Sequence, residues 1–327
     1  MINQKIISYY TNRIIRKLKN FEFKTFLVGV VSGKEKDNKF EKPFKKNIGK
    51  IIEEKLEKKV DFKNHDVLIL IDLKNKKIDY QIKPLYLFGR YQKLVAGIPQ
   101  TKWKRKKFKT SVQEEIGKTL LKITKGKDHS FHGCGREDID VVTVGEGRPF
   151  VIEIIDPKIR KFDVKKAEEE INKNSKMVKV SNLAITTKEK VKEIKLAQPD
   201  KIYETEVELE KEVEKKELEK ACQLLSNIII SQQTPTRVLK RRYDLLRKKK
   251  VYYFKLKKYH PKNPTFEIKT QSGTYIKELI SGDNGRTKPS LSEILNQKTV
   301  VKKLVVKKIL LKISNEKLVF KPSYQRP

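Results

Sequence analysis

The first part of the chain carries apolar patterns that predict a small α/β module. Apolar side chains recur at helical spacing over residues 6–18, and a continuous apolar run at residues 26–31 predicts a buried strand. A charged helical stretch follows at residues 48–59. Two strands are expected next, at residues 67–72 and 78–82, and the short polar segment between them predicts a hairpin.

The rest of the chain alternates strand-like and helix-like patterns. In residues 203–209 the odd positions are Tyr, Thr, Val and Leu and the others are Glu, which predicts a half-buried strand with Tyr203 on its inner face. Apolar side chains from Leu218 to Ile229 line one face of a predicted helix. The other expected elements are strands at 141–144 and 150–155 joined by a turn at Gly145–Gly147, a helix capped by Thr234–Pro235 and continuing to Lys248–Lys250, a strand at 266–270, a helix capped by Ser290 with Glu293, and one or two strands at 300–311.

Domain organisation follows from the point where the periodicity stops. Pro99 and the basic cluster at residues 102–109 interrupt the apolar pattern, so we place a domain boundary near residue 100. This predicts an N-terminal domain of residues 1–100 and a second domain of residues 101–327. A chain of 327 residues is long enough for each domain to bury its own core.

Charge then points to a polyanionic partner. Lys and Arg total 77 against 41 Asp and Glu, a formal charge of +36, in a chain that is 37% hydrophobic and 36% charged. Such an excess repels itself in the folded state unless a polyanion shares the surface, and nucleic acid is the polyanion that releases counterions on binding. The alternative is a Lys-biased composition with no functional meaning. A membrane surface is a weaker candidate, because no segment is a basic amphipathic helix with a clean apolar face.

Cysteine and histidine usage argues against disulfides and metals. The two cysteines, Cys134 and Cys222, are far apart, and the four histidines show no metal-ligand spacing apart from the local pair His129 and His132. We therefore expect no metal and no other cofactor. The longest apolar runs are too short to span a bilayer, and the N-terminus lacks a signal-peptide pattern, so the sequence predicts a cytoplasmic protein.

Three separated segments carry residues suited to chemistry. Residues 132–154 place Arg136, Asp138 and Asp140 close together, and a fixed cation helps a desolvated carboxylate to stay ionised. The competing interpretation is a surface salt bridge. Tyr203 taken alone indicates an ordinary core tyrosine. Residues 272–295 taken alone indicate a loop followed by a capped helix.

Together these segments resemble the pseudouridine synthases, and most closely the archaeal-type tRNA T-loop family called Pus-ten. The match runs in order through KPLYLFGRYQKLVAGIPQTKW (83–103), HGCGREDIDVVTVGEGRPFVIEI (132–154), ISQQTPTRVLKRRYDLLR (230–247) and residues 272–295. The resemblance implies an α+β catalytic domain with a mixed, largely antiparallel sheet, preceded by a small α/β domain that contains a THUMP RNA-binding region. It further implies isomerisation of uridine to pseudouridine in the T loop, at position 54, 55 or both.

The resemblance also implies roles for individual residues. Asp138 matches the family's essential aspartate, Tyr203 the tyrosine that packs against the target base, and Lys277 the basic residue that pairs with the aspartate. Further substrate contacts are expected from the apolar and polar residues around these three: Leu279, Arg136 and Tyr275. Basic residues are the candidates for phosphate contacts with tRNA: Lys102, Lys104, Arg105, Lys106, Lys107, Arg237, Arg241 and Arg242.

Three other functions compete with this interpretation. An RNA-binding protein without catalysis explains the charge, but not the order of Asp, Tyr and Lys. A THUMP-bearing methyltransferase should show a glycine-rich nucleotide loop, and a sulfur transferase reactive cysteines, neither of which stands out here. The third is Cys134 acting as a nucleophile beside His132. Nothing in the sequence requires a protein partner or a membrane.

Overall fold

The computed structural model describes residues 4–31, 38–103 and 107–311. The chain divides into two compact units, Met1–Ile139 with Pro149–Lys195, and Asp140–Arg148 with Leu196–Pro327. The crossing between the units falls inside one strand, β7 (Val142–Ile155). Across the described ranges, no helix combines the length and the hydropathy needed to cross a bilayer.

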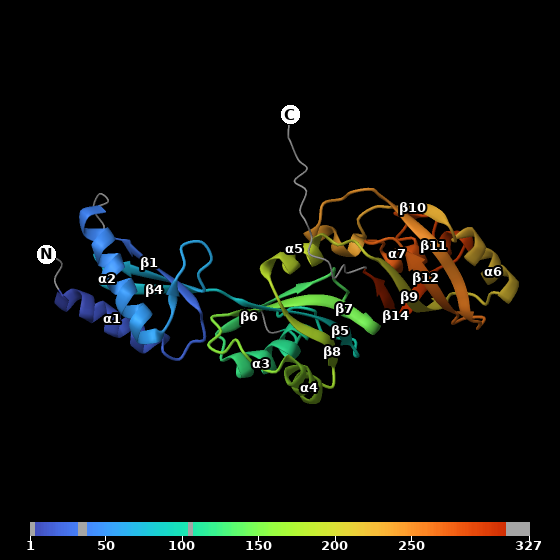
Figure 1. Ribbon diagram of the computed structural model, residues 1–327. Coiled ribbons are helices and arrows are strands. Elements are labelled where there is room, and N and C mark those ends of the chain that lie inside the picture. Colours follow the sequence, from blue (N-terminus) through green and yellow to red (C-terminus); the bar gives the residue numbers. More distant parts are fainter. Residues whose placement is uncertain (1–3, 32–37, 104–106, 312–327) are drawn as a thin grey trace. The chain divides into compact units, whose positions relative to one another are not determined.

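The N-terminal part of the first unit is a four-stranded mixed sheet with two helices (Figure 1). The strand order is β2–β1–β3–β4; β1 is parallel to β2 and β3, and β3 forms a hairpin with β4. Apolar residues of α1 and α2 share one core with the inner faces of β1 and β3, as the period of the sequence predicts. The elements are α1 (Gln4–Leu18), β1 (Thr25–Val31), α2 (Asn38–Leu56), β2 (Lys59–Val60), β3 (Val67–Asp72) and β4 (Lys77–Ile82).

The remainder of the first unit has a second core, formed where helices pack on antiparallel strands. Strand β8 pairs with β5, β5 neighbours β7, and β6 pairs with residues 150–155 of β7. Phe150, Ile152 and Ile154 lie on one face of β7 and are completely buried in this core. The elements are β5 (Leu85–Lys93), α3 (Val112–Thr124), β6 (Asp128–Gly133), α4 (Val164–Asn174), β8 (Val178–Thr186) and α5 (Lys188–Leu196).

The second unit is built on an antiparallel sheet in the order β13–β10–β11–β12–β9–β14. Strand β14 also pairs in parallel with residues 142–143 of β7. Lys201, Tyr203, Thr205, Val207 and Leu209 are the buried positions of β9, which confirms the alternation predicted for residues 203–209. The elements are β9 (Asp200–Leu209), α6 (Lys215–Leu224), β10 (Ile228–Gln232), a 3-10 helix (Thr236–Arg241), β11 (Arg247–Lys258), β12 (Thr265–Thr270), α7 (Ile276–Ser281), β13 (Thr287–Lys288), α8 (Leu291–Ile294) and β14 (Thr299–Leu310).

Three predicted elements are wrong. The helix face expected from Leu218 to Ile229 ends at Leu224, and Ile229 lies in β10 with 63% of its surface exposed. The expected turn at Gly145–Gly147 lies inside the single strand β7. Both glycines have positive φ, and a Cβ on Gly145 would lie 2.3 Å from the carbonyl oxygen of Lys307, so the glycines permit a close approach to β14. The helix expected from Thr234 to Lys250 is only a short 3-10 turn that ends at Arg241, because residues 247–251 pair with β10. Thr234 caps no helix; its hydroxyl donates to the carbonyl of Tyr243 at 2.7 Å.

The α+β class is confirmed. Antiparallel pairs dominate, and parallel pairs occur at β1 and at the β14–β7 contact. The division of the chain at residue 100 and the THUMP assignment of the N-terminal domain stay predictions.

Candidate active site

Asp138 lies in the loop that joins β6 to β7, and a buried lysine holds the backbone of this loop. Lys93, the last residue of β5, has no exposed surface. Its ammonium group donates to the carbonyl oxygens of Asp138 at 3.2 Å, Ile139 at 2.9 Å and Ile98 at 3.0 Å. An ammonium group has three N–H donors, so it can serve all three carbonyls at once and hold the main chain at Asp138 and Ile139.

A second buried network holds the residue before Asp138. The hydroxyl of Tyr91, which is fully buried, donates to the carboxylate of Glu137 at distances of 2.7 and 2.9 Å from its two oxygens. The side-chain amide of Gln100 donates to the Tyr91 hydroxyl at 2.8 Å and to the Gly135 carbonyl at 3.1 Å. Glu137 is thereby tied to β5, and the backbone of the residue before Asp138 is held in place.

In the second unit, Lys277 of α7 forms an ion pair with Asp140. Its ammonium nitrogen lies 2.8 and 2.7 Å from the two carboxylate oxygens. Partial burial raises the pKa of Asp140, but the hydrogen bond and charge of Lys277 outweigh it, and the pKa lies below its ordinary value of 3.8. The structure thus gives Lys277 a partner that the resemblance did not name. The expected pairing of Lys277 with Asp138 stays a prediction.

Tyr203 lies in the core of the second unit with 9% of its surface exposed. Burial raises the pKa of Tyr203 to about 12, and the nearby positive charge of Arg148 partly opposes this shift. The phenol is therefore neutral throughout the physiological range. Arg148 is itself 1% exposed and is the largest fully buried side chain among the described residues. A buried guanidinium on β7 beside Tyr203 is a feature that the sequence argument missed.

Leu279 and Tyr275 are held around α7. Leu279 is completely buried in the core, whereas the Tyr275 hydroxyl accepts a hydrogen bond from Arg242 at 2.9 Å. The side-chain amide of the buried Gln232 bridges the backbone of Tyr275: the Tyr275 N–H donates to its oxygen and the Tyr275 carbonyl accepts from its nitrogen, each at 2.9 Å. The start of α7, and with it Lys277, is therefore anchored to β10.

The predicted phosphate contacts that the structure describes divide into three groups. Arg237 is engaged in an ion pair, with its Nε 2.7 Å from the buried carboxylate of Glu278. Arg241 and Arg242 are exposed beside Tyr243, which is 88% exposed. Lys102 and Lys107 are exposed on the first unit, and the Lys107 ammonium lies 6.0 Å from the centre of the Trp103 ring. The other three predicted contacts lie outside the described residues: Lys104, Arg105 and Lys106.

The alternative chemistry at Cys134 finds no support in the geometry. Cys134 is completely buried, and its backbone N–H donates to the Pro149 carbonyl at 2.9 Å. His132 lies with its Nε2 3.2 Å from a carboxylate oxygen of Glu153. A buried thiol cannot reach a substrate, so we regard Cys134 as a packing residue of the loop.

The predicted site residues are distributed over both compact units. Asp138 and the exposed Arg136 belong to the first unit, whereas Tyr203, Lys277, Leu279 and Tyr275 belong to the second. The residues that hold the loop and α7 in place were not among the predicted site residues. Their one signal in the sequence is polar residues at inward-facing positions of otherwise apolar strands: Tyr91, Lys93, Arg148 and Gln232.

Comparison with known proteins gives consistent matches. The family model described as "Pus10, C-terminal" matches residues 86–309. The chain is 40% identical to "tRNA pseudouridine synthase Pus10" of Methanocaldococcus jannaschii, over 94% of this chain and 74% of that protein. It is 39% identical to the protein of the same name from Thermofilum pendens, over 86% of this chain and 69% of that one. A chain of the solved Cbf5–Nop10–Gar1 complex is similar at 18% identity and a TM-score of 0.39, covering 67% of this chain and 47% of that chain.

Proposed function

The chain belongs to the Pus10 family, and on that premise we propose that it is a tRNA pseudouridine synthase that modifies uridine 54, uridine 55 or both in the T loop. The observation that carries the proposal is the extent of the match: residues 86–309 include the loop with Asp138, the strand with Tyr203 and the helix with Lys277. The relatives named above act on tRNA according to their names, and the +36 charge of this chain suits such a partner.

The proposed reaction is an isomerisation that needs no second substrate. The C1′–N1 glycosidic bond breaks, the uracil rotates in the closed site, and a C1′–C5 bond forms. The proton on C5 is lost and N1 gains one, so the mass of the RNA does not change. Asp138 promotes the first step, either as a nucleophile at C1′ or by taking a proton from the ribose. No cofactor takes part in this proposal.

The target nucleotide must leave the stack before any of this chemistry. Flipping costs a few kcal/mol, and stacking of the uracil on the ring of Tyr203 recovers about 1–3 kcal/mol of that cost. A neutral phenol suits this role, because the ring offers a flat apolar face and no charge that needs solvation. Leu279 belongs to the same core as Tyr203, and in this proposal Arg136, Tyr275 and Lys277 contact the flipped nucleotide.

The surrounding basic residues hold the tRNA. Arg241 and Arg242 are exposed in the second unit, as are Lys102 and Lys107 in the first, and their exposure supports a proposed role in neutralising phosphate. Lys104, Arg105, Lys106 and Arg237 complete the proposed set. The N-terminal domain adds RNA affinity as a THUMP-containing domain. The proposed enzyme works in the cytoplasm, without a membrane and without an obligate protein partner.

Mapping of carbodiimide adducts on tRNA tests this function directly. Incubation with the protein should produce adduct stops at position 54, 55 or both, with no change in RNA mass. Asp138→Ala should give no stops while binding tRNA as the unchanged protein does, because the side chain contributes to chemistry and not to phosphate contacts. A mass increase would indicate methylation or thiolation, and tRNA binding without stops by the unchanged protein would indicate an RNA-binding protein. Pseudouridine formed by Asp138→Ala would refute the role of Asp138.

A further inference from the structure

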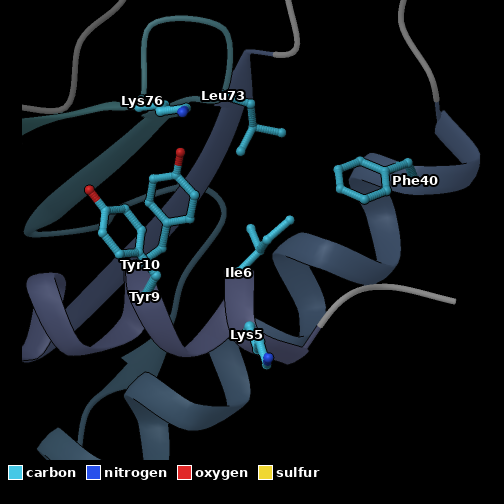
Figure 2. Close-up of a pocket in the computed structure, with 7 residues that line it drawn as sticks. All are labelled: Lys5, Ile6, Tyr9, Tyr10, Phe40, Leu73 and Lys76. Carbon is cyan, nitrogen blue, oxygen red and sulfur yellow. The ribbon is translucent and has the colours of Figure 1, made fainter.

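The N-terminal module contains a cavity that the proposed reaction does not use. It has a volume of about 510 Å³ and opens between α1, the start of α2 and the β3–β4 hairpin (Figure 2). Pockets of roughly 300–1,000 Å³ hold ligands of nucleotide size. Its lining combines aromatic and aliphatic side chains with two lysines: Lys5, Ile6, Tyr9, Tyr10, Phe40, Leu73 and Lys76.

The aromatic side chains of the cavity are fixed in place. The rings of Tyr9 and Tyr10 meet edge to face, with centres 5.2 Å apart. Arg13 lies one helical turn after Tyr9 and donates to its hydroxyl at 2.6 Å. Phe40 stacks on the buried Phe44 at 5.4 Å. Even so, 50% of the surface of Tyr9 and 41% of that of Ile6 are exposed, which leaves apolar surface that a flat ligand could cover.

The charges around this cavity select the ligand. Lys5 lies on α1 and Lys76 on the tip of the hairpin, so ammonium groups come from two separate elements, as Figure 2 shows. Both lysines are exposed, and neighbouring Lys74 adds positive charge to the hairpin, whereas the charge of Lys77 is paired with Asp79 at 2.9 Å. A second copy of this strongly basic chain would meet repulsion here. An aromatic surface between cations matches an unpaired nucleotide, whose base stacks while its phosphates pair with the lysines.

We propose that this cavity binds one unpaired nucleotide of RNA, with the base against Tyr9 and the flanking phosphates at Lys5 and Lys76. The proposal deepens the proposed function, since the RNA concerned is the tRNA on which the enzyme acts. The cavity contributes affinity and no chemistry. It would read an unpaired segment of the substrate, which the exposed lysines elsewhere on the surface cannot distinguish from a duplex.

The test compares the binding of a short single-stranded oligouridine and of a fully paired RNA duplex by the full chain. Tyr9→Ala should weaken the single strand by at least about fivefold, the lower end of base stacking, and leave the duplex unchanged. Phe62→Ala is the matched control, because Phe62 is 80% exposed on the same module outside the cavity. Equal binding of the single strand by Tyr9→Ala and the unchanged protein would overturn the proposal, as would an equal loss for the duplex.

A second variant removes the ambiguity of misfolding. The first turn of α1 has no acidic residue, so Lys5→Glu improves the electrostatics of the helix N-terminus while reversing a charge at the cavity. Lys5→Glu should bind oligouridine more weakly than Lys50→Glu, an equal change of charge at an exposed position of α2 outside the cavity. Equal losses in the two variants would show a diffuse charge effect and overturn the proposal. A dimer of the unchanged protein that Tyr9→Ala dissociates would also overturn it.

The outcome is separable from that of the proposed function. Oligouridine binding is measured without turnover, so a protein that binds through Tyr9 but forms no pseudouridine would refute the proposed activity and support the cavity. If the protein forms pseudouridine and Tyr9→Ala binds oligouridine as well as the unchanged protein does, the proposed activity is supported and the cavity site is refuted.

Discussion

The ammonium group of Lys277 lies 2.7 Å from a carboxylate oxygen of Asp140, two residues after Asp138 in the chain. Asp140 is the first residue of the second compact unit. Asp138 belongs to the first unit, whose N-terminal segment ends at the next residue, Ile139. The Lys277–Asp140 pair therefore fixes the end of the loop that carries the proposed catalytic acid. Mutation of Asp140 removes the ion pair of Lys277 and leaves any direct effect of Lys277 on Asp138 in place, so the two can be measured separately.

We expect Lys277→Met to lower kcat on the order of a hundredfold, with little change in the dissociation constant for tRNA, because loss of a fixed charge at a reacting group has effects of that size. Asp140→Asn separates the two routes by which Lys277 could act. If Lys277 stabilises Asp138 directly, Asp140→Asn should keep most of the activity. If both variants lose activity equally, Lys277 works through Asp140 and the direct role is wrong. Single-turnover kinetics on T-loop RNA provides the measurement.

The same pair predicts how stability changes in acid. The pKa of Asp140 in the folded protein lies below its ordinary value of 3.8, so its stabilising contribution is complete above that value and is lost as the pH falls through the folded-state pKa. Because 65% of the Asp140 side chain is exposed, the contribution should be at most about 1 kcal/mol. Urea unfolding of the unchanged protein and of Asp140→Asn should therefore differ near pH 7 and converge in acid. A difference that grows as the pH falls would contradict the pairing.

The sequence predicted the regular elements well where one face is buried. The alternation of Tyr203 to Leu209 and the capping of α8 by Ser290, whose hydroxyl accepts from the Glu293 N–H at 3.2 Å, both follow local rules that tertiary contacts do not override. The expected helix after Thr234 failed for the opposite reason. Pairing of residues 247–251 with β10 outweighs local helix preference, and such pairing depends on residues distant in the sequence.

The supporting residues of the site could not be predicted by local patterns. Lys93 reads as one more lysine in a chain with 77 basic residues, and only the fold shows that it is buried against three carbonyl groups. Arg148 likewise follows a glycine in what the pattern indicates is a surface turn. The catalytic and substrate-binding residues were predicted from the resemblance to a family. The residues that position them are recognised by their burial, and neither charge nor periodicity in the sequence shows which polar residues are buried.

Removal of Lys93 should affect both stability and turnover. We expect Lys93→Met to destabilise the fold by about 2–5 kcal/mol, because the carbonyls of Ile98, Asp138 and Ile139 lose a buried donor. Two of these carbonyls belong to Asp138 and Ile139, so kcat of the folded fraction should fall as well, while the affinity for tRNA stays the same. Thermal unfolding and single-turnover kinetics below the transition measure the two effects. An unchanged kcat in folded Lys93→Met would show that Lys93 only stabilises the fold.

Tyr203 offers a test that distinguishes its ring from its hydroxyl. The pKa of Tyr203 is raised to about 12 by burial, so the phenol should not ionise below pH 10, and its proton should contribute nothing to the pH dependence of the reaction. Tyr203→Phe keeps the stacking surface and should retain kcat within about threefold, whereas Tyr203→Ala should lose tenfold or more, roughly the value of one base–ring contact. Tyr203→Ala also leaves a cavity in the core, at a cost of about 3–5 kcal/mol, so its activity must be measured below its unfolding transition.

Rates for the unchanged protein and for Tyr203→Phe should run parallel from pH 7 to pH 10. A decline with pH that appears in the unchanged protein and is absent from Tyr203→Phe would show that the hydroxyl takes part in the chemistry, and the stacking role would then be insufficient.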